Sequence, residues 1–229
     1  MIGVITYNIP HRKTQDLMWR LILKGYDLTL LIIPFKQRDK SRVIYNHRPT
    51  NTFDSSPLNY DLPRIICNDY NDIALYINDF EKILIAGAEL LPDKVTKKGN
   101  IINSHPGYLP NVKGLDALKW AIYNEQPIGV TTHTINDKTD SGLLIDRQII
   151  PVYYEDTFHS LAYRVYEKEI EMLVHAIELP PISDPIMKDV LINDNYKPNM
   201  RMPWYLERIM IDRFENLRKI SPSQWGENE

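Results

Sequence analysis

Cysteine is nearly absent from the sequence, since Cys67 is the single one among 229 residues. One cysteine cannot form an internal disulfide, and this favours a reducing compartment. No apolar run approaches the ~18 residues that a membrane-spanning helix requires. Residues 1–6 are strand-like and lack the basic and apolar segments of a secretory signal. We therefore expect a cytoplasmic protein with no membrane partner.

A strong excess of either charge is lacking as well. The 27 lysines and arginines face 30 aspartates and glutamates, which gives a net charge of −3. No basic face is implied, so we expect no nucleic-acid partner. The hydrophobic share of 43% and the charged share of 25% match an ordinary globular protein. The length allows one domain of the usual size with a modest extension.

Strand-like and helix-like segments alternate along most of the chain. Short apolar or β-branched runs predict strands at residues 2–6, 28–33, 64–67, 83–85, 100–103, 129–135 and 143–152. Amphipathic spacing predicts helices at residues 11–25, 71–80, 115–124, 156–179 and 204–220, with a helical turn at 92–97. This order favours the α/β class, with a Rossmann-like, mostly parallel sheet and helices on both faces. Ligands of such sheets bind beyond the carboxyl ends of the strands.

Two segments depart from this alternation. Residues 34–63 are polar and lack periodicity, which predicts a long surface loop, and loops of this length often serve binding. Beyond Pro180, further prolines interrupt the pattern before the last predicted helix. We expect a main domain at 1–180 and a helical C-terminal extension at 181–229. Ile209, Met210 and Phe214 of the last helix can pack on the core or form a homodimer contact, and the sequence leaves both open.

Asn103, His105 and Asp140 form the most informative group of polar residues. Asn103 and His105 stand two apart at the end of a predicted strand, so their side chains point the same way. Pro106 and Pro110 stiffen the loop that follows, and Asp140 lies in a loop between two predicted strands. An amide can stabilise an oxyanion, an imidazole can move protons near neutral pH, and a carboxylate can orient the imidazole. The three groups together suit acyl transfer to an amine.

A longer pattern surrounds these residues. Asn-x-His-Pro-x-x-Leu-Pro runs from Asn103 to Pro110, and Gly114, Trp120-Ala121, Val130-Thr131-x-His133 and Asp140-x-Gly142 follow. The pattern resembles the formyltransferases that use N10-formyltetrahydrofolate, which include glycinamide ribonucleotide transformylase, methionyl-tRNA formyltransferase and the sugar N-formyltransferases. The resemblance implies that Asn103, His105 and Asp140 are the catalytic residues. It also implies that the folate co-substrate binds at Ile85, Ala86, Gly87, Leu90, His133 and Asp140.

The first half of the chain is expected to hold the amine that receives the formyl group. No glycine-rich phosphate loop follows the first strand, which argues against the purine precursor, and the short, slightly acidic chain argues against tRNA. The basic loop at 35–49 looks like that of the sugar N-formyltransferases. The resemblance implies a nucleotide-linked amino sugar, dTDP-4-amino-4,6-dideoxyglucose or its galacto isomer, used in bacterial surface polysaccharides such as the O-antigen of lipopolysaccharide.

The acceptor contacts expected from this loop and from the first strand are aromatic, amide and basic side chains. Basic groups can pair with a pyrophosphate, and Tyr7 or Tyr45 can stack on a base. The predicted contacts are Tyr7, Asn8, His11, Lys13, Lys36, Arg38, Tyr45 and Arg48.

The same residues allow other interpretations. His105, His133 and Asp140 are adequate metal ligands, but a metal site gives Asn103 no role, so we expect no metal. Asp137 competes with Asp140 for the carboxylate role, and His133 can support a loop as well as contact folate. The chain can also formylate another small amine, or bind a nucleotide sugar without catalysis.

Overall fold

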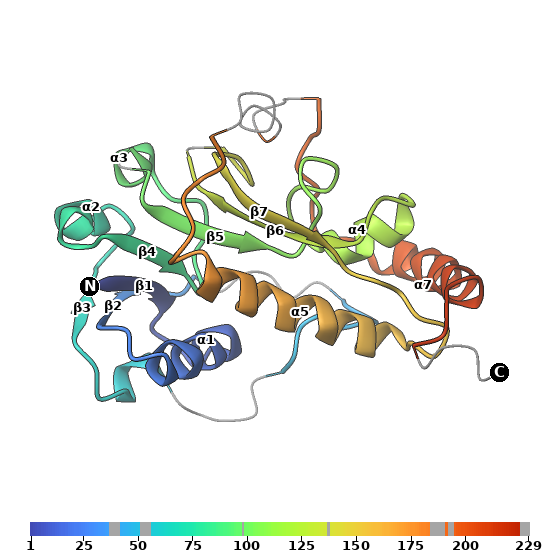
Figure 1. The fold of residues 1–229 in the computed structure, drawn as a ribbon, viewed down its shortest axis with the longest axis horizontal. Helices are drawn as coiled ribbons and strands as arrows, with labels where there is room; N and C mark the ends of the chain where they lie inside the picture. The colour runs from blue at the N-terminus through green and yellow to red at the C-terminus, as the bar shows by residue number, and fades with distance from the viewer. Residues whose placement is uncertain are drawn as a thin grey trace.

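A computed structural model of the protein describes residues 1–36, 42–50, 56–97, 99–136, 138–183, 191 and 195–224. Its centre is a seven-stranded sheet with the strand order β3-β2-β1-β4-β5-β6-β7 (Figure 1). The strands are β1 (Ile2–Tyr7), β2 (Leu28–Ile33), β3 (Arg64–Ile66), β4 (Lys82–Ile85), β5 (Ile101–His105), β6 (Gly129–Thr134) and β7 (Leu144–Ile149). Every predicted strand is present, with small differences at the ends.

The direction of the strands confirms the predicted architecture. Neighbouring strands from β3 to β5 run parallel, whereas β6 pairs antiparallel with both β5 and β7. Strand order reverses its sense between β1 and β4, which are neighbours in the sheet. In open α/β sheets, a ligand crevice forms beyond the carboxyl ends of the strands at such a point. The fold is therefore a Rossmann-like, mostly parallel sheet, and its topology marks where a site is expected.

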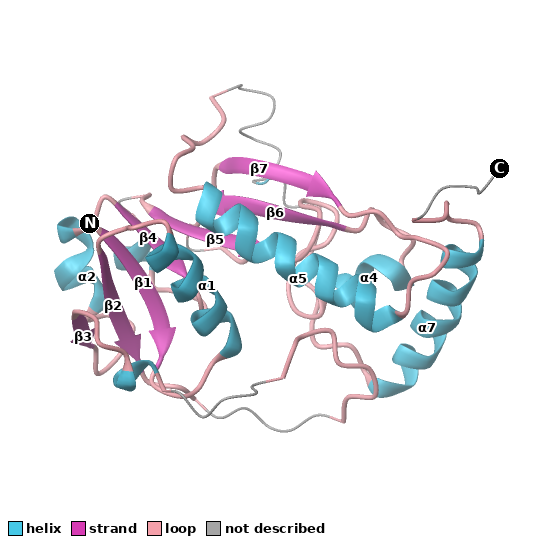
Figure 2. Cartoon of the chain, turned by 60° about the horizontal axis from the view of Figure 1, so that its bottom comes forward, coloured by secondary structure: helices cyan, strands magenta, loops and turns pink. Residues whose placement is uncertain are grey.

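Helices cover both faces of the sheet, because adjacent residues of a strand face opposite ways. Val4 of β1 packs with α1 (Arg12–Leu23) and α5 (Phe158–His175), while the next residue, Ile5, packs with the opposite layer. That layer holds α2 (Ile73–Tyr76), the 3-10 helix η2 (Ile77–Asp79) and α3 (Asp93–Thr96). Figure 2 shows α1 and α5 side by side on their face. The position of β1 between two apolar layers explains its continuous apolar sequence.

The helix predicted at residues 71–80 is shorter than expected. A single α-helical turn, α2, passes directly into the 3-10 helix η2. Ile73 and Ile77 are the buried residues of these two short helices, and Phe80, which follows them, is buried in an extended conformation. Two apolar side chains cover too little surface to hold a longer helix by packing, which is the main source of helix stability in proteins.

The last part of the chain packs on the core. α4 (Ala117–Tyr123) and α7 (Trp204–Lys219) lie against each other (Figure 2), and both join a cluster with the first half of α5. Met210 and Phe214 are fully buried there, whereas Ile209 is 43% exposed. The sequence leaves open whether these three residues pack on the core or form a dimer contact, and the structure places Met210 and Phe214 in the core. None of the described helices is long and apolar enough to cross a membrane.

The surface segment between β2 and β3 matches its prediction in the parts that the structure describes. At 34–36, 42–50 and 56–63, the chain forms loops and one short 3-10 helix, η1 (Pro57–Asn59). Residues 42–50 return to the body of the protein and contact α5 and α7. This contact brings a loop from the first half of the chain to the pocket described next.

Candidate active site

A pocket of about 760 Å³ opens beyond the carboxyl ends of β1, β4 and β5. This volume lies within the range of ~300–1,000 Å³ that is typical of small-molecule sites. Its position is the one that the reversal of strand order predicts. Lining residues lie within segments 7–13, 43–49, 85–91, 103–106, 114–119, 133–136, 138–140, 166–169 and 198–201.

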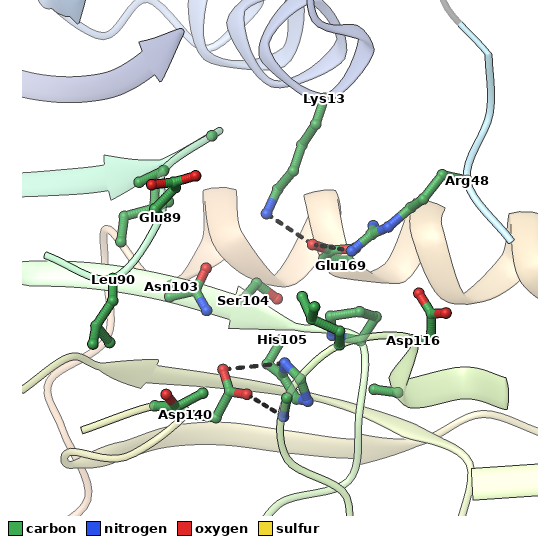
Figure 3. Close-up of a pocket in the computed structure, with 18 of the residues that line it drawn as sticks. Lys13, Arg48, Glu89, Leu90, Asn103, Ser104, His105, Asp116, Asp140 and Glu169 are labelled. Atoms are coloured by element: carbon green, nitrogen blue, oxygen red, sulfur yellow. Dashed lines mark hydrogen bonds and ion pairs between the residues drawn. The ribbon is translucent and has the colours of Figure 1, made fainter. Parts of the chain in front are cut away.

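His105 ends β5 and is 4% exposed. Its Nε2 donates to the carbonyl oxygen of Val112 at 2.9 Å, and its Nδ1 lies 3.2 Å from Oδ1 of Asp140 (Figure 3). Carbonyl and carboxylate oxygens only accept hydrogen bonds. An imidazole with hydrogen on both ring nitrogens therefore satisfies both neighbours. The structure holds the His105 ring between a carbonyl and a carboxylate inside the pocket.

Asp140 is fixed by its own backbone and by a turn that follows β5. Its φ of 45° is left-handed, a conformation that costs energy in a residue with a side chain and often marks functional sites. Oδ2 accepts the backbone N–H of Gly114 at 2.6 Å. Gly142 closes the same loop with a φ of +129°, and a Cβ there would lie 2.0 Å from the carbonyl oxygen of Thr134. The loop can pass this close to β6 because residue 142 is glycine.

The turn at residues 113–115 is held in place by Asn199. Leu115 N–H donates to the Asn199 carbonyl at 2.9 Å, and Asn199 N–H donates to the Lys113 carbonyl at 2.8 Å. The Asn199 side-chain amide donates to the same Lys113 carbonyl at 3.0 Å. Between them, Gly114 has a φ of +89°, and a Cβ on it would lie 2.3 Å from the Asn199 oxygen. A residue far along the chain thus secures the turn that donates to Asp140.

Asn103 and His133 face each other across the β5–β6 pair. Figure 3 places the Asn103 amide in the same space as His105 and Asp140. Among the residues that the structure describes, no side chain or backbone group binds that amide, so its hydrogens can meet a ligand. His133 is 1% exposed, and its Nδ1 meets the Thr134 carbonyl at 2.7 Å, while its buried Nε2 has no hydrogen-bond partner among the residues that the structure describes. Burial lowers the pKa of His133, more than Asp140 raises it.

A second group of charges lies across the pocket from Asp140 (Figure 3). Glu169 of α5 is fully buried, with Oε1 2.7 Å from Nζ of Lys13, and its Oε2 accepts from Arg48. Burial raises the pKa of Glu169, but the charges of Arg48 and Lys13 outweigh it and leave the pKa at about 2. Burial lowers the pKa of Lys13 against the opposing effect of Glu169. With Lys13 protonated, these three side chains together carry one net positive charge.

Two histidines in this half of the pocket are neutral at ordinary pH. Burial lowers the pKa of His11 to about 4, and the charges of Lys13 and Arg48 add to that effect. Burial likewise lowers the pKa of His47 to about 3, with further lowering by Arg48 and Lys119. Both rings can therefore form hydrogen bonds with a ligand without adding charge.

The structure brings most of the predicted site residues together. The residues expected at the folate all line the pocket, namely Ile85, Ala86, Gly87, Leu90, His133 and Asp140. Asn103 and His105 line it as well, and so do four of the predicted acceptor contacts, Tyr7, His11, Lys13 and Arg48.

Three predicted acceptor contacts lie away from the pocket wall. Asn8 is exposed, and its side-chain oxygen accepts the N–H of Phe35 at 3.0 Å. Lys36 is exposed on the surface loop. The ring of Tyr45 packs edge-to-face with Phe158 at 6.0 Å between centroids and is not among the residues that line the pocket. Two further residues, Arg38 and Asp137, lie outside the described residues.

The sequence did not single out Glu169, Asp116 or Lys119, which also line the pocket. Lys119 is fully buried on α4, and Glu169 is fully buried on α5. A signal for both was present, since each is a charged residue among the apolar positions of an amphipathic helix. Such residues are seldom buried unless they are paired. In the part of the chain that the structure describes, no three His, Cys, Asp or Glu side chains lie close enough together to hold a metal ion.

Comparison with known proteins identifies the family. The chain is 31% identical to the phosphoribosylglycinamide formyltransferase of Haemophilus influenzae over 94 residues, which are 39% of this chain and 44% of that protein. It is 31% identical to the methionyl-tRNA formyltransferase of Synechococcus over 109 residues, 44% of this chain and 34% of that protein. The matched regions thus span less than half the length of these curated relatives.

A solved structure shares the fold over nearly the whole chain. The sugar N-formyltransferase from Shewanella sp FDAARGOS_354 superposes with a TM-score of 0.60 at 18% identity, covering 93% of this chain and 87% of that one. Residues 36–177 match the family described as Formyl transferase, whose formyl donor is N10-formyltetrahydrofolate. The matched segment contains Asn103, His105 and Asp140 with the strands and loops that position them. The chain therefore belongs to the formyl transferase family.

Proposed function

We propose that this protein transfers the formyl group of N10-formyltetrahydrofolate to the amine of a nucleotide-linked amino sugar. The observation that carries the proposal is the 3.2 Å approach of His105 Nδ1 to Asp140 Oδ1, beside the Asn103 amide, at one end of a pocket that has Lys13 and Arg48 around Glu169 at the other. One end offers acyl-transfer chemistry, and the other offers charge for a phosphorylated acceptor.

The catalytic roles follow from the contacts of each side chain. As the acceptor amine attacks, negative charge develops on the formyl oxygen, and a preorganised donor stabilises such charge. The Asn103 amide supplies that donor. His105 adds a proton-bearing ring that is fixed between Val112 and Asp140. Asp140 orients the ring and helps to relay the proton that the amine loses to N10 of the folate, so that the bond between the formyl carbon and N10 breaks and tetrahydrofolate is the leaving group.

The donor side of the pocket fits a folate. When bound, the folate supplies the formyl group. Residues 85–91 offer apolar side chains and backbone groups for a flat, partly apolar ring, and the orphaned Nε2 of His133 offers a buried hydrogen-bonding atom. A buried polar atom without a partner is costly, so a ligand atom that reaches it gains affinity.

The acceptor side fits a phosphorylated sugar. Arg48 and Lys13 share one carboxylate, and the excess positive charge suits a diphosphate, with Arg48 exposed enough to reach it. His11 and His47 supply neutral hydrogen-bonding groups for sugar hydroxyls. We propose a dTDP-linked 4-amino-4,6-dideoxy sugar as the acceptor, in the cytoplasm, with a product used for surface polysaccharides. The proposed acceptor contacts do not include Asn8, Lys36 or Tyr45.

Sequence similarity does not separate the acceptors, since relatives for glycinamide ribonucleotide and for methionyl-tRNA match about equally well. A panel assay separates them. The protein is incubated with N10-formyltetrahydrofolate and, in turn, dTDP- and UDP-linked 4-amino sugars, glycinamide ribonucleotide and methionyl-tRNA. We expect formylation of a nucleotide sugar with the highest kcat/KM. Faster formylation of either other acceptor would overturn the sugar assignment while leaving the formyl transfer intact.

A further inference from the structure

We propose that Glu207 is a positioning residue for the acceptor half of the pocket and acts by anchoring segment 42–50. Glu207 lies on α7, in the C-terminal extension and outside the family match at 36–177. It does not line the pocket itself. Its influence on the reaction would therefore be exerted through the residues that it holds.

The contacts of Glu207 use both carboxylate oxygens. Oε2 accepts the backbone N–H of Ile44 at 2.6 Å and that of Tyr45 at 3.0 Å. Oε1 accepts from Nζ of Lys119 at 2.6 Å, and both side chains are fully buried. A buried carboxylate is stable in such a place only with full hydrogen bonding. Glu207 thus ties α7, α4 and segment 42–50 into one charged cluster.

Segment 42–50 forms a wall of the acceptor half. Val43, Asn46, His47, Arg48 and Pro49 all line the pocket, on either side of the two backbone groups that Glu207 holds. The described contacts further along the segment are the Arg48 pair with Glu169 and a 3.8 Å approach of His47 to Asp116. Arg48 is the exposed member of its pair, with 39% of its side chain accessible.

The anchor at Ile44 and Tyr45 joins two backbone groups of the segment to a fully buried carboxylate, and it fixes where the cations and neutral histidine of the segment face the pocket. The donor half is built from other elements, residues 85–91 after β4 and the loop that carries Asp140. Loosening the anchor should weaken binding of the acceptor and leave binding of the folate unchanged. The expected change in KM rests on the proposed function, whereas the anchoring of segment 42–50 does not.

Glu207→Gln tests the inference, because an amide keeps the shape but cannot accept from all three donors. Met210→Ala is the matched control, since Met210 is buried on the same helix and does not line the pocket. We expect KM for the acceptor to rise about tenfold in Glu207→Gln, the effect of losing a charge-assisted hydrogen bond. KM for the folate and kcat should stay near their wild-type values. In Met210→Ala, KM for the acceptor should stay unchanged despite a lower melting temperature.

Amide hydrogen exchange provides a readout that needs no acceptor. The proteins are compared under conditions that give them the same free energy of unfolding. Amide exchange across residues 42–50 should then be faster than wild type in Glu207→Gln and should stay at the wild-type rate in Met210→Ala. Unchanged exchange there, or an equal rise of KM for both substrates, overturns the inference. If Glu207→Gln does not fold, Glu207→Asp, which keeps the charge but withdraws it by one methylene, takes its place. If the wild type formylates no panel member, the proposed function fails, and the exchange rates alone decide the role of Glu207.

Discussion

The backbone N–H of Gly114 donates to the carboxylate of Asp140 at 2.6 Å, and the turn that presents it also places the Val112 carbonyl on His105. Both members of the His105–Asp140 pair, which we propose to be catalytic, therefore depend on one short turn. Asn199 holds the far side of that turn through backbone hydrogen bonds. The geometry of the pair is thus set by residues that take no part in the chemistry.

Replacement of Gly114 tests this dependence. Gly114→Ala places a Cβ 2.3 Å from the Asn199 oxygen at a φ of +89°. We expect a loss of about 3 kcal/mol of stability, from strain and overpacking together, with a fall in kcat. Gly25→Ala is the control, because its φ is +76° but nothing lies within 4 Å, and it should lose only about 1 kcal/mol. Equal losses of stability in chemical denaturation would show that the Asn199 contact does not constrain the turn.

Removal of either member of the catalytic pair should act on the chemical step. His105→Asn deletes the proton-bearing ring, and Asp140→Asn deletes the charge that orients it. We expect kcat to fall about 100-fold or more in each, the usual cost of losing a proton-transfer group, with a smaller change in KM for the acceptor. Steady-state kinetics on purified variants measures both constants. Near-normal kcat in either variant would refute the assignment.

Charge at Arg48 should govern the affinity for a phosphorylated acceptor. Arg48→Met removes a bidentate donor from the pocket while Lys13 still compensates Glu169. We expect KM for the acceptor to rise about tenfold, as for the loss of a hydrogen bond to a charged group, and the salt dependence of kcat/KM to weaken. Lys36→Met, on the exposed loop away from the pocket, is the charge-matched control. The same rise in both variants would mean that long-range charge, and not contact at Arg48, binds the acceptor.

The neutral state of His47 should appear in the pH dependence of stability. Its pKa in the folded protein is about 3, below the ordinary 6.5, so the unfolded chain binds a proton that the folded chain does not. The free energy of unfolding is therefore unaffected by this histidine above pH 6.5 and decreases as the pH falls toward 3. In His47→Gln, the slope of unfolding free energy against pH between about 4 and 6 should fall by about 1.4 kcal/mol per pH unit. Denaturant titrations at several pH values measure this slope, and an unaltered slope would contradict the shifted pKa.

Local signals in the sequence are sufficient to predict the sheet and to bring the proposed catalytic residues to one pocket. Alternating apolar runs located the strands, because each buried strand of a parallel sheet is apolar on both faces. Asn103 and His105 were predicted to face one way because they stand two apart on a strand, and both line the pocket. The spacing to Asp140 came from the resemblance, and the structure places it beside His105.

The acceptor half depended on contacts between distant parts of the chain, which no local pattern encodes. Tyr45 lies in a predicted surface loop, yet its ring packs on Phe158 and its backbone N–H donates to Glu207. The sequence predicts Lys13 and Arg48 as cations that contact the acceptor, yet both pair with Glu169, which lies on a helix far along the sequence. The sequence shows Glu169 and Glu207 as acids among the apolar positions of two predicted helices. It does not show which basic side chains pair with them, because those residues lie far away along the chain.

Formation of tetrahydrofolate is the most direct measurement of the central claim. The protein is mixed with N10-formyltetrahydrofolate and dTDP-4-amino-4,6-dideoxyglucose or its galacto isomer, and tetrahydrofolate and N-formylated sugar are quantified together. The account predicts that the two products appear in equal amounts and that neither forms without the sugar. Absence of tetrahydrofolate with both sugars, or its release without a formylated amine, would contradict formyl transfer to an amino sugar at Asn103, His105 and Asp140.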